Sequence, residues 1–157
     1  DRPKVAASAD RLTALNPHVA IEPFVERLTP DNARGVIEGF DVVLDGTDDF
    51  ETRLAVSAAC VATGTPLVSG ALGRWNGQVG VFTGQPCYQC LVPETPPDAE
   101  TCARVGAMAA LEAIKLITGA GQPLAGRLML YDGLAGSSRV VKVVADPSCP
   151  VCGSAHA

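Results

Sequence analysis

The sequence contains few aromatic residues, no cluster of basic residues and no long apolar run. Aromatic side chains make up 4% of the 157 residues, so small aliphatic side chains must form most of the core. The formal net charge of −5 and the scattered Lys and Arg residues argue against nucleic-acid binding, which requires a basic surface. No apolar run reaches the roughly 18 residues that a membrane span requires. Because no signal peptide opens the sequence, the protein is predicted to be soluble and cytoplasmic.

Hydrophobic residues, by contrast, are abundant and occur along the whole chain. They account for 47% of the residues and charged residues for 18%, which is typical of a globular protein. The length suits one domain that spans residues 1–157. Ala, Val, Leu and Gly dominate, and such small residues allow helices to pack closely on a β-sheet.

The order of the apolar segments predicts an α/β fold. The run Phe40–Asp45 is mostly apolar until its final acid, as in a central parallel strand with both faces covered. A helix over 50–62 follows, capped by Thr47 or Asp49, and 66–69 forms a second buried strand. This order predicts a parallel crossover in a mostly parallel sheet. The other predicted elements are helices over 4–15 and 107–118, a short helix capped by Thr29, an alternating segment over 18–25, and strands over 78–83, 127–131 and 138–144, the last two antiparallel.

Four of the six cysteines form two Cys-x-x-Cys pairs, Cys87 with Cys90 and Cys149 with Cys152. In a cytosolic chain such pairs favour zinc over disulfides. A two-residue gap lets both thiolates of a tight turn face one ion, and two turns complete a tetrahedral shell. Because that shell is closed, the zinc is predicted to be structural. The alternative is two independent redox or free pairs.

The remaining two cysteines, Cys60 and Cys102, lie in different sequence contexts. Cys60 falls within a predicted helix among Ala and Val residues, so it is interpreted as a small buried hydrophobic residue. Cys102 follows a polar stretch that resembles an exposed loop. It is either a nucleophile or an ordinary surface cysteine, and the residues around it leave both interpretations open.

Three carboxylates follow the predicted strand that ends at Asp45, in the sequence DGTDDF. The carboxyl ends of parallel strands form the edge at which open sheets bind ligands. Asp45, Asp48 and Asp49 offer the hard oxygen ligands that Mg²⁺ prefers beside substrate phosphates. The alternative is that Asp49 only caps the next helix and Asp45 only ends the strand.

Taken together, these segments resemble the ThiF/MoeB/HesA adenylyltransferases, which are relatives of the ubiquitin-activating enzymes. The resemblance implies a Rossmann-like sheet flanked by helices, with late antiparallel strands and a structural zinc knuckle. It also implies an enzyme that uses MgATP to adenylate the C-terminal glycine of a small ubiquitin-fold sulfur carrier. The matching segments are RPK at 2–4, ALNPHV at 14–19, VVLDGTDDFETR at 42–53, PLVSGALGRWNGQVGVF at 66–82, PCYQCL at 86–91, ALEAIKLITG at 110–119 and CPVCG at 149–153.

The resemblance assigns a role to individual residues. Asp48 corresponds to the family's Mg²⁺-binding aspartate, and Lys4 to the lysine that reaches the ATP phosphates. The four paired cysteines correspond to the zinc ligands. Cys102 corresponds to a cysteine that some members use to form a thioester or persulfide. Arg53 follows the acidic turn and could contact it, but it is interpreted as a charge on the helix surface. A homodimer and a carrier that ends in Gly-Gly, from a molybdopterin or thiamine type of pathway, are also implied.

The sequence departs from the family pattern at two places. The glycine-rich GxGGxGS turn that cradles ATP phosphates is not seen, and ARVG joins AMAALEAIK near 106–107 where the family has a further segment. The N-terminal βαβ portion and this loop are therefore expected to belong to a longer protein. The alternative function is a catalytically silent, zinc-stabilised module that docks the carrier. A nicotinamide-dependent dehydrogenase is disfavoured, because no GxGxxG motif is visible.

Overall fold

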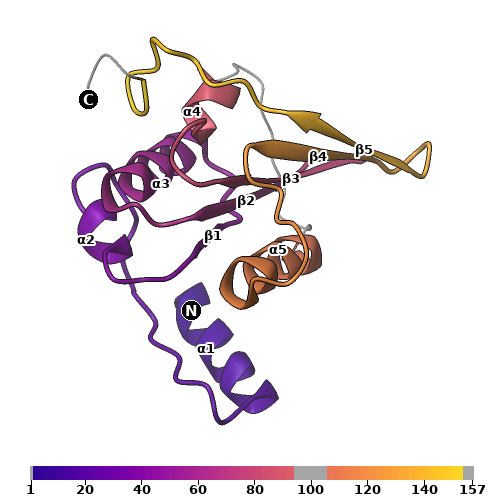
Figure 1. The fold of residues 1–157 in the computed structure, drawn as a ribbon. Helices are drawn as coiled ribbons and strands as arrows, with labels where there is room; N and C mark the ends of the chain where they lie inside the picture. The colour runs from indigo at the N-terminus through magenta and orange to yellow at the C-terminus, as the bar shows by residue number, and fades with distance from the viewer. Residues whose placement is uncertain (1, 94–105, 154–157) are drawn as a thin grey trace.

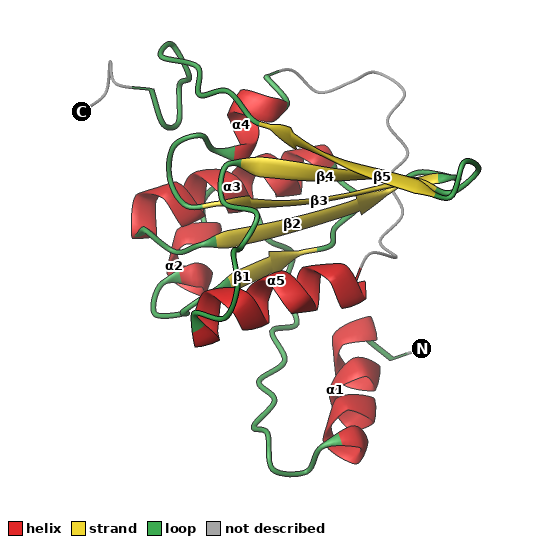
Figure 2. Ribbon diagram, turned by 45° about the vertical axis from the view of Figure 1, so that its right-hand side comes forward, coloured by secondary structure: helices red, strands yellow, loops and turns green. Residues whose placement is uncertain are grey.

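Residues 2–93 and 106–153 of the chain are described by a computed structural model. Their strands form a single twisted sheet with helices on both faces (Figures 1 and 2). The strands lie side by side in chain order. They are β1 (Val43–Asp45), β2 (Leu67–Leu72), β3 (Asn76–Phe82), β4 (Arg127–Asp132) and β5 (Ser137–Lys142).

Only the first pair of neighbouring strands in this sheet is parallel. Val43 of β1 aligns with Leu67 of β2, and the long connection between them contains a helix, as predicted. The three other pairings are antiparallel. The α/β class and the late antiparallel strands are confirmed, but the sheet described is not mostly parallel. The reason is the connection from Leu72 to Asn76, which is too short for a crossover and makes a hairpin instead.

The helices divide between the two faces of the sheet. The core on one face is formed by α2 (Ala33–Ile37), α3 (Phe50–Thr63) and α4 (Tyr88–Leu91), together with Leu67, Phe82 and Leu128 from the sheet. On the other face α5 (Gly106–Thr118) packs on Val68, Val79 and Val81. Neighbouring residues of β2 therefore face opposite cores, as the alternation of a strand requires.

Helix α3 begins and ends where its capping residues predict. The Asp49 carboxylate accepts a hydrogen bond from the backbone N–H of Thr52 at 3.0 Å, so Asp49 is the N-cap. Gly64 ends the helix in the left-handed conformation, with φ 71°. Because Asp49 directly follows Asp48, this cap also holds one end of the acidic turn.

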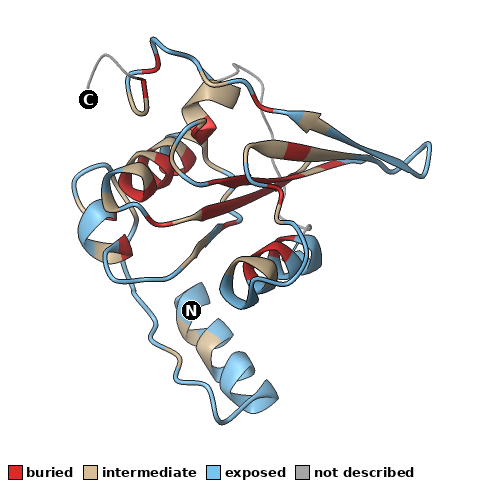
Figure 3. Cartoon of the chain, viewed as in Figure 1, coloured by how far each residue is buried: buried red, intermediate tan, exposed pale blue. Residues whose placement is uncertain are grey.

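Helix α1 (Lys4–Leu15) has the predicted boundaries but a different environment from the other long helices. None of its residues is buried, and Figure 3 shows it as exposed or intermediate along its length. Of the described helices, none combines the length and the apolar character that a membrane crossing requires.

Two local predictions between α1 and β1 are wrong. The alternating segment over 18–25 is irregular and belongs to no strand, which agrees with Pro23, a residue that has no backbone donor for a ladder. The N-cap of α2 is Asn32 and not Thr29. The Asn32 side chain accepts a hydrogen bond from the Thr29 N–H at 2.8 Å, so the two residues form one turn before the helix.

Candidate functional site

The four paired cysteines meet at one point, although the two pairs lie far apart in the sequence. The Sγ atoms of Cys87 and Cys149 are 3.7 Å apart, and those of Cys90 and Cys152 are 3.4 Å apart. All four sulfur atoms lie within 4.8 Å of one another. Zn–S bonds of about 2.3 Å in a tetrahedron place the sulfur atoms about 3.8 Å apart. The four-cysteine cluster therefore has the dimensions of a tetrahedral thiolate metal site.

The second pair is held in place by a tight backbone turn that requires glycine at position 153. The Gly153 N–H donates to the Cys149 carbonyl at 2.9 Å. A Cβ atom at Gly153 would lie 2.5 Å from that carbonyl oxygen and 2.6 Å from the Pro147 carbonyl oxygen. The Asp146 N–H also donates to the Cys90 sulfur at 3.5 Å, which links the two pairs. Backbone N–H bonds to metal-bound sulfur orient a ligand from outside the coordination shell.

The protonation preferences of these thiols differ sharply. Burial raises the pKa of Cys87, and burial together with hydrogen bonds to Cys90 and Cys87 raises that of Cys152. Burial also opposes ionisation of Cys149, but the N–H groups of Cys152 and Val151 outweigh it and lower the pKa to about 7. The thiolate is favoured at Cys149, whereas the thiol is favoured at Cys87 and Cys152. Four thiolates together therefore need a cation among them.

The acidic turn after β1 is built on a buried carboxylate. Asp45 is 5% exposed, and its Oδ1 accepts hydrogen bonds from the N–H of Thr47 at 2.9 Å and from its hydroxyl at 2.7 Å. Asp49 caps α3, and hydrogen bonds from Thr52 followed by the charge of Arg27 lower its pKa. Asp48, between the two, is exposed. Asp45 and Asp49 thus have structural roles, and Asp48 presents its carboxylate at the surface.

Arg53 is the largest departure from the sequence interpretation. It is 1% exposed and is not a charge on the helix surface. Its guanidinium donates to the carbonyl oxygens of Thr47 and Gly70, the latter at 2.8 Å, and to the Ser69 hydroxyl at 3.1 Å. It therefore joins the acidic turn to β2. Helical spacing could have indicated this burial from the sequence. Position 53 shares a helix face with Val56, Ser57 and Cys60, all of which are buried.

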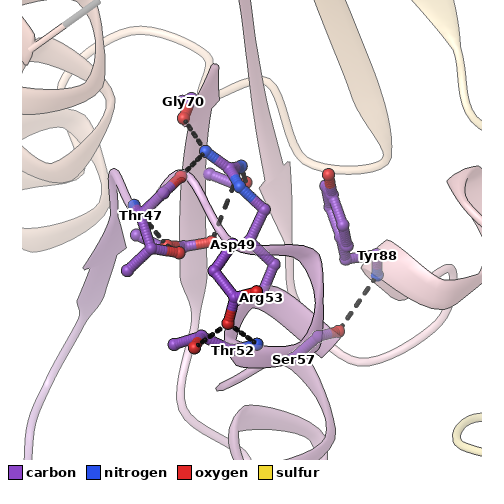
Figure 4. A network of polar contacts seen from close by, with 9 residues as sticks. Thr47, Asp49, Thr52, Arg53, Ser57, Gly70 and Tyr88 are labelled. Atoms are coloured by element: carbon purple, nitrogen blue, oxygen red, sulfur yellow. Dashed lines mark hydrogen bonds and ion pairs between the residues drawn. The ribbon is translucent and has the colours of Figure 1, made fainter. Parts of the chain in front are cut away.

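Two buried charges face each other in this network without a full hydrogen bond. Arg53 Nη1 lies 3.7 Å from Asp45 Oδ2, and both side chains are almost completely buried. Among the described residues, Asp45 Oδ2 and Arg53 Nε are the buried side-chain polar atoms that lack a hydrogen-bond partner. Figure 4 shows Arg53 with Thr47 on one side and Tyr88 on the other. Each buried charge thus has the other as its nearest opposite charge.

The other candidate residues belong neither to the acidic turn nor to the four-cysteine cluster. Lys4 is exposed in the first turn of α1. Cys102 lies outside the described residues. Cys60 is 3% exposed in α3, and burial followed by the charge of Asp45 raises its pKa to about 12, which confirms the interpretation as a small buried residue. No described cysteine forms a disulfide.

An open hollow of about 700 Å³ lies on the sheet. It begins at Ala71, the neighbour of the Gly70 carbonyl that Arg53 holds, and extends across β3, β4 and β5. Most of its lining side chains are polar or small. They belong to Ala71, Gly73, Asn76, Gly77, Gln78, Leu130, Tyr131, Asp132, Ser137, Ser138 and Arg139.

The sequence is similar to those of a known protein family and of several named enzymes. The ThiF family matches residues 1–151. The sulfur carrier protein adenylyltransferase of Thermus thermophilus is 43% identical over 170 residues, covering 96% of this chain and 63% of that protein. The molybdopterin-synthase adenylyltransferase of Escherichia coli is 40% identical over 165 residues, covering 97% and 66% respectively. The chain therefore spans a little less than two thirds of the length of these relatives.

Solved structures show the same fold at low sequence identity. The crystal structure of E. coli MccB with MccA-N7isoASN matches with a TM-score of 0.81 and 17% identity, covering 96% of this chain and 52% of that one. The structure of MccB with ATP gives a TM-score of 0.78 at 16% identity, covering 95% and 51%. At these identities the likeness concerns the arrangement of the elements alone.

Proposed function

Because this chain belongs to the ThiF family, we propose that it serves in the ATP-dependent adenylation of the C-terminal glycine of a small ubiquitin-like sulfur carrier. Relatives named as a sulfur carrier protein adenylyltransferase and a molybdopterin-synthase adenylyltransferase support the substrate class. The activated carrier would then take part in sulfur transfer of the molybdopterin or thiamine type. We further propose that the enzyme works as a homodimer in the cytoplasm.

The reaction requires two anions to approach each other. A carboxylate oxygen of the carrier attacks the α-phosphorus of ATP, and pyrophosphate leaves as the acyl-adenylate forms. Mg²⁺ bound to the phosphates neutralises charge on them when it is present. We assign Asp48 as a ligand of that ion and Lys4 as a contact of the phosphates. Because phosphate-bound Mg²⁺ usually takes only one or two carboxylates from protein, one exposed aspartate on a firmly held turn suits this role.

The observation that carries this proposal is the position of the acidic turn. Asp48 follows the carboxyl end of β1, where Asp45 aligns with Ser69 of the parallel strand β2, and this is the edge at which open sheets bind ligands. Asp45 holds one end of the turn and the Asp49 cap holds the other. A preorganised carboxylate spends no binding energy on being ordered when the ion arrives.

The hollow on the sheet suits the extended C-terminal tail of the carrier. It begins next to the Gly70 segment, so a peptide that lies in it ends close to the acidic turn. Asn76 and Gln78 offer amide groups that can hydrogen-bond to a peptide backbone. Arg139 offers a positive charge to a negatively charged group of the peptide. A tail that ends in Gly-Gly has no side chains that would prevent its close approach to the sheet.

We assign the four-cysteine cluster to a structural zinc ion and Cys102 to a later step. The cluster satisfies the donor type and spacing of zinc, and its four ligands leave no position for substrate. Zinc there would join α4 to the C-terminal segment. The Cys102 thiol would act after adenylation, when a sulfur nucleophile attacks the acyl-adenylate, so adenylation itself does not need it.

The test is ATP–pyrophosphate exchange with a carrier that ends in Gly-Gly. Asp48→Asn is expected to lower exchange at least about 100-fold, because the neutral amide is a poor Mg²⁺ ligand. Asp41→Asn, an exposed acid on the other side of β1, is the matched control and should retain exchange. Unchanged exchange in Asp48→Asn would remove this residue from the role. A chain that binds the carrier but never supports exchange would instead be a docking module.

A further inference from the structure

Tyr88 connects the four-cysteine cluster to the acidic turn. It lies between two cluster residues in the sequence, directly after Cys87 and two residues before Cys90. Its ring faces the Arg53 guanidinium, whose carbon is 6.0 Å from the ring centroid. Both residues are almost fully buried, Tyr88 at 2% and Arg53 at 1% exposure. A cation this close to a desolvated aromatic face is attracted to it.

The position of this ring depends on the fold around the cysteines. The Tyr88 N–H donates to the Ser57 hydroxyl of α3 at 3.2 Å. The edge of the ring meets Phe82 at a centroid distance of 5.7 Å and an interplanar angle of 85°. These contacts hold the ring against Arg53 only while the short helix α4 keeps its conformation. Because α4 starts and ends beside cysteines of the cluster, a metal held by these cysteines would fix that conformation.

Arg53 is held by hydrogen bonds to Thr47, Gly70 and Ser69, and the Tyr88 ring packs against it as a further restraint. The Arg53 Nε atom has no hydrogen-bond partner, and its ion pair with Asp45 is 3.7 Å long, so packing against the ring limits its movement. The same guanidinium holds the Thr47 carbonyl, one residue before Asp48. Movement of the ring would therefore reach the acidic turn through two contacts.

We propose that Tyr88 and Arg53 are positioning residues through which the metal at the four-cysteine cluster sets the geometry of the acidic turn. The metal then does more than stabilise the fold, because its occupancy decides how well Asp48 is placed. The consequence for catalysis rests on the proposed function, whereas the structural link does not. Neither residue touches the substrate, so both act through the turn.

The experiment compares the metal-loaded full chain with Tyr88→Leu and Tyr88→Phe. Leucine keeps apolar volume but removes the aromatic face, whereas phenylalanine keeps the face and removes only the hydroxyl. The first readout is amide hydrogen exchange across 45–53, which needs no activity. The second is the apparent Mg²⁺ requirement of ATP–pyrophosphate exchange. Leu128→Ala, a change in the same core on β4, is the control for general destabilisation.

Tyr88→Leu should retain its metal. Its Thr47 amide hydrogen should nevertheless exchange with solvent roughly tenfold faster than in the wild type, because local opening of the turn becomes easier. The Leu124 amide, which donates to Glu112 on the other face, should keep its protection. The Mg²⁺ requirement should rise several-fold with little change in rate at saturating Mg²⁺. Tyr88→Phe should loosen the turn less than Tyr88→Leu does, because it keeps the aromatic face and loses only the hydroxyl, which also interacts with Arg53. Leu128→Ala should not single out the turn.

Equal protection of the Thr47 amide in Tyr88→Leu and wild type would overturn the proposal. Amide hydrogen exchange in Tyr88→Leu that speeds up equally at the turn and at Leu124 would also overturn it, because that result indicates general destabilisation. If no variant supports adenylation but the turn still loosens only in Tyr88→Leu, the proposed function fails and the link between Tyr88 and the turn stands. The two failures can therefore be distinguished.

Discussion

The acidic turn and helix α1 carry the two residues assigned to the nucleotide, yet they are built in opposite ways. Asp48 lies between residues that are tied to α3 and β2 by short hydrogen bonds and a buried ion pair. Lys4 lies on a helix with no buried residue. Figure 1 shows the same contrast. Helix α1 lies apart from the sheet, whereas the acidic turn follows β1 at the edge of the sheet.

Two residues that match the family pattern equally well can therefore be held in place to very different degrees. A carboxylate that binds an ion must be held accurately, because coordination distances are short and specific. A lysine is a flexible point charge and tolerates a looser base. Substitutions in the buried, firmly held regions should therefore cost more stability than substitutions on α1, which has no buried residue.

The largest effect is expected at the four-cysteine cluster. Cys149→Ala removes one ligand and should release the metal, with a loss of more than about 5 kcal/mol of stability, because metal binding supplies folding free energy. Metal analysis and thermal unfolding measure the two effects. Cys60→Ala, a buried thiol outside the cluster, should retain about one metal per chain and lose only about 1 kcal/mol. Equal metal content in both variants would contradict the assignment of the cluster.

A smaller but still large effect is expected at Arg53. Arg53→Leu leaves Asp45 buried without its partner, which should cost about 3–5 kcal/mol in denaturant unfolding. Adding Asp45→Asn should recover part of that loss, because the uncompensated charge is removed while the side-chain oxygen still accepts from Thr47. A double variant no more stable than Arg53→Leu alone would show that the ion pair is not the source of the cost.

The smallest effect on stability is expected at Lys4. Lys4→Ala should change the free energy of unfolding by no more than about 0.5 kcal/mol, because the side chain is exposed and its helix has no buried residue. It should nevertheless raise the apparent KM for ATP, if Lys4 contacts the phosphates as proposed. Arg11→Ala, another exposed cation on α1, should alter neither quantity. A large stability loss in Lys4→Ala would mean that α1 is more firmly packed than its exposure indicates.

Much of the local structure was predictable, because it depends on neighbouring residues. The boundaries of α1 follow from apolar spacing and from Pro17, and those of α3 follow from Asp49 and Gly64. The meeting of two Cys-x-x-Cys pairs followed from metal chemistry, which demands four ligands. The segment over 18–25 failed because alternation alone does not make a strand, which also needs a partner with which to pair.

The direction of β3 and the role of Arg53 depended on long-range contacts. The sequence indicated a strand over 78–83, and the hairpin after Leu72 made it antiparallel. Arg53 looked like a surface charge because a charged side chain usually stays in water, although its spacing from Val56 and Cys60 placed it on the apolar face of the helix. Its partners Ser69 and Gly70 come from the next strand, and Tyr88 comes from a segment further along the chain.

The sequence by itself determined the family, most of the element order, the four cysteines that meet in one cluster and the acid at the end of β1. These features depend on residue type and spacing, which the chain carries wherever it folds. Only the tertiary structure decided that Arg53 is buried, that Asp45 is its partner and that Tyr88 lies between the cysteines and the turn. The reason is physical: a buried charge is stable only where several distant groups converge on it, and packing alone brings those groups together.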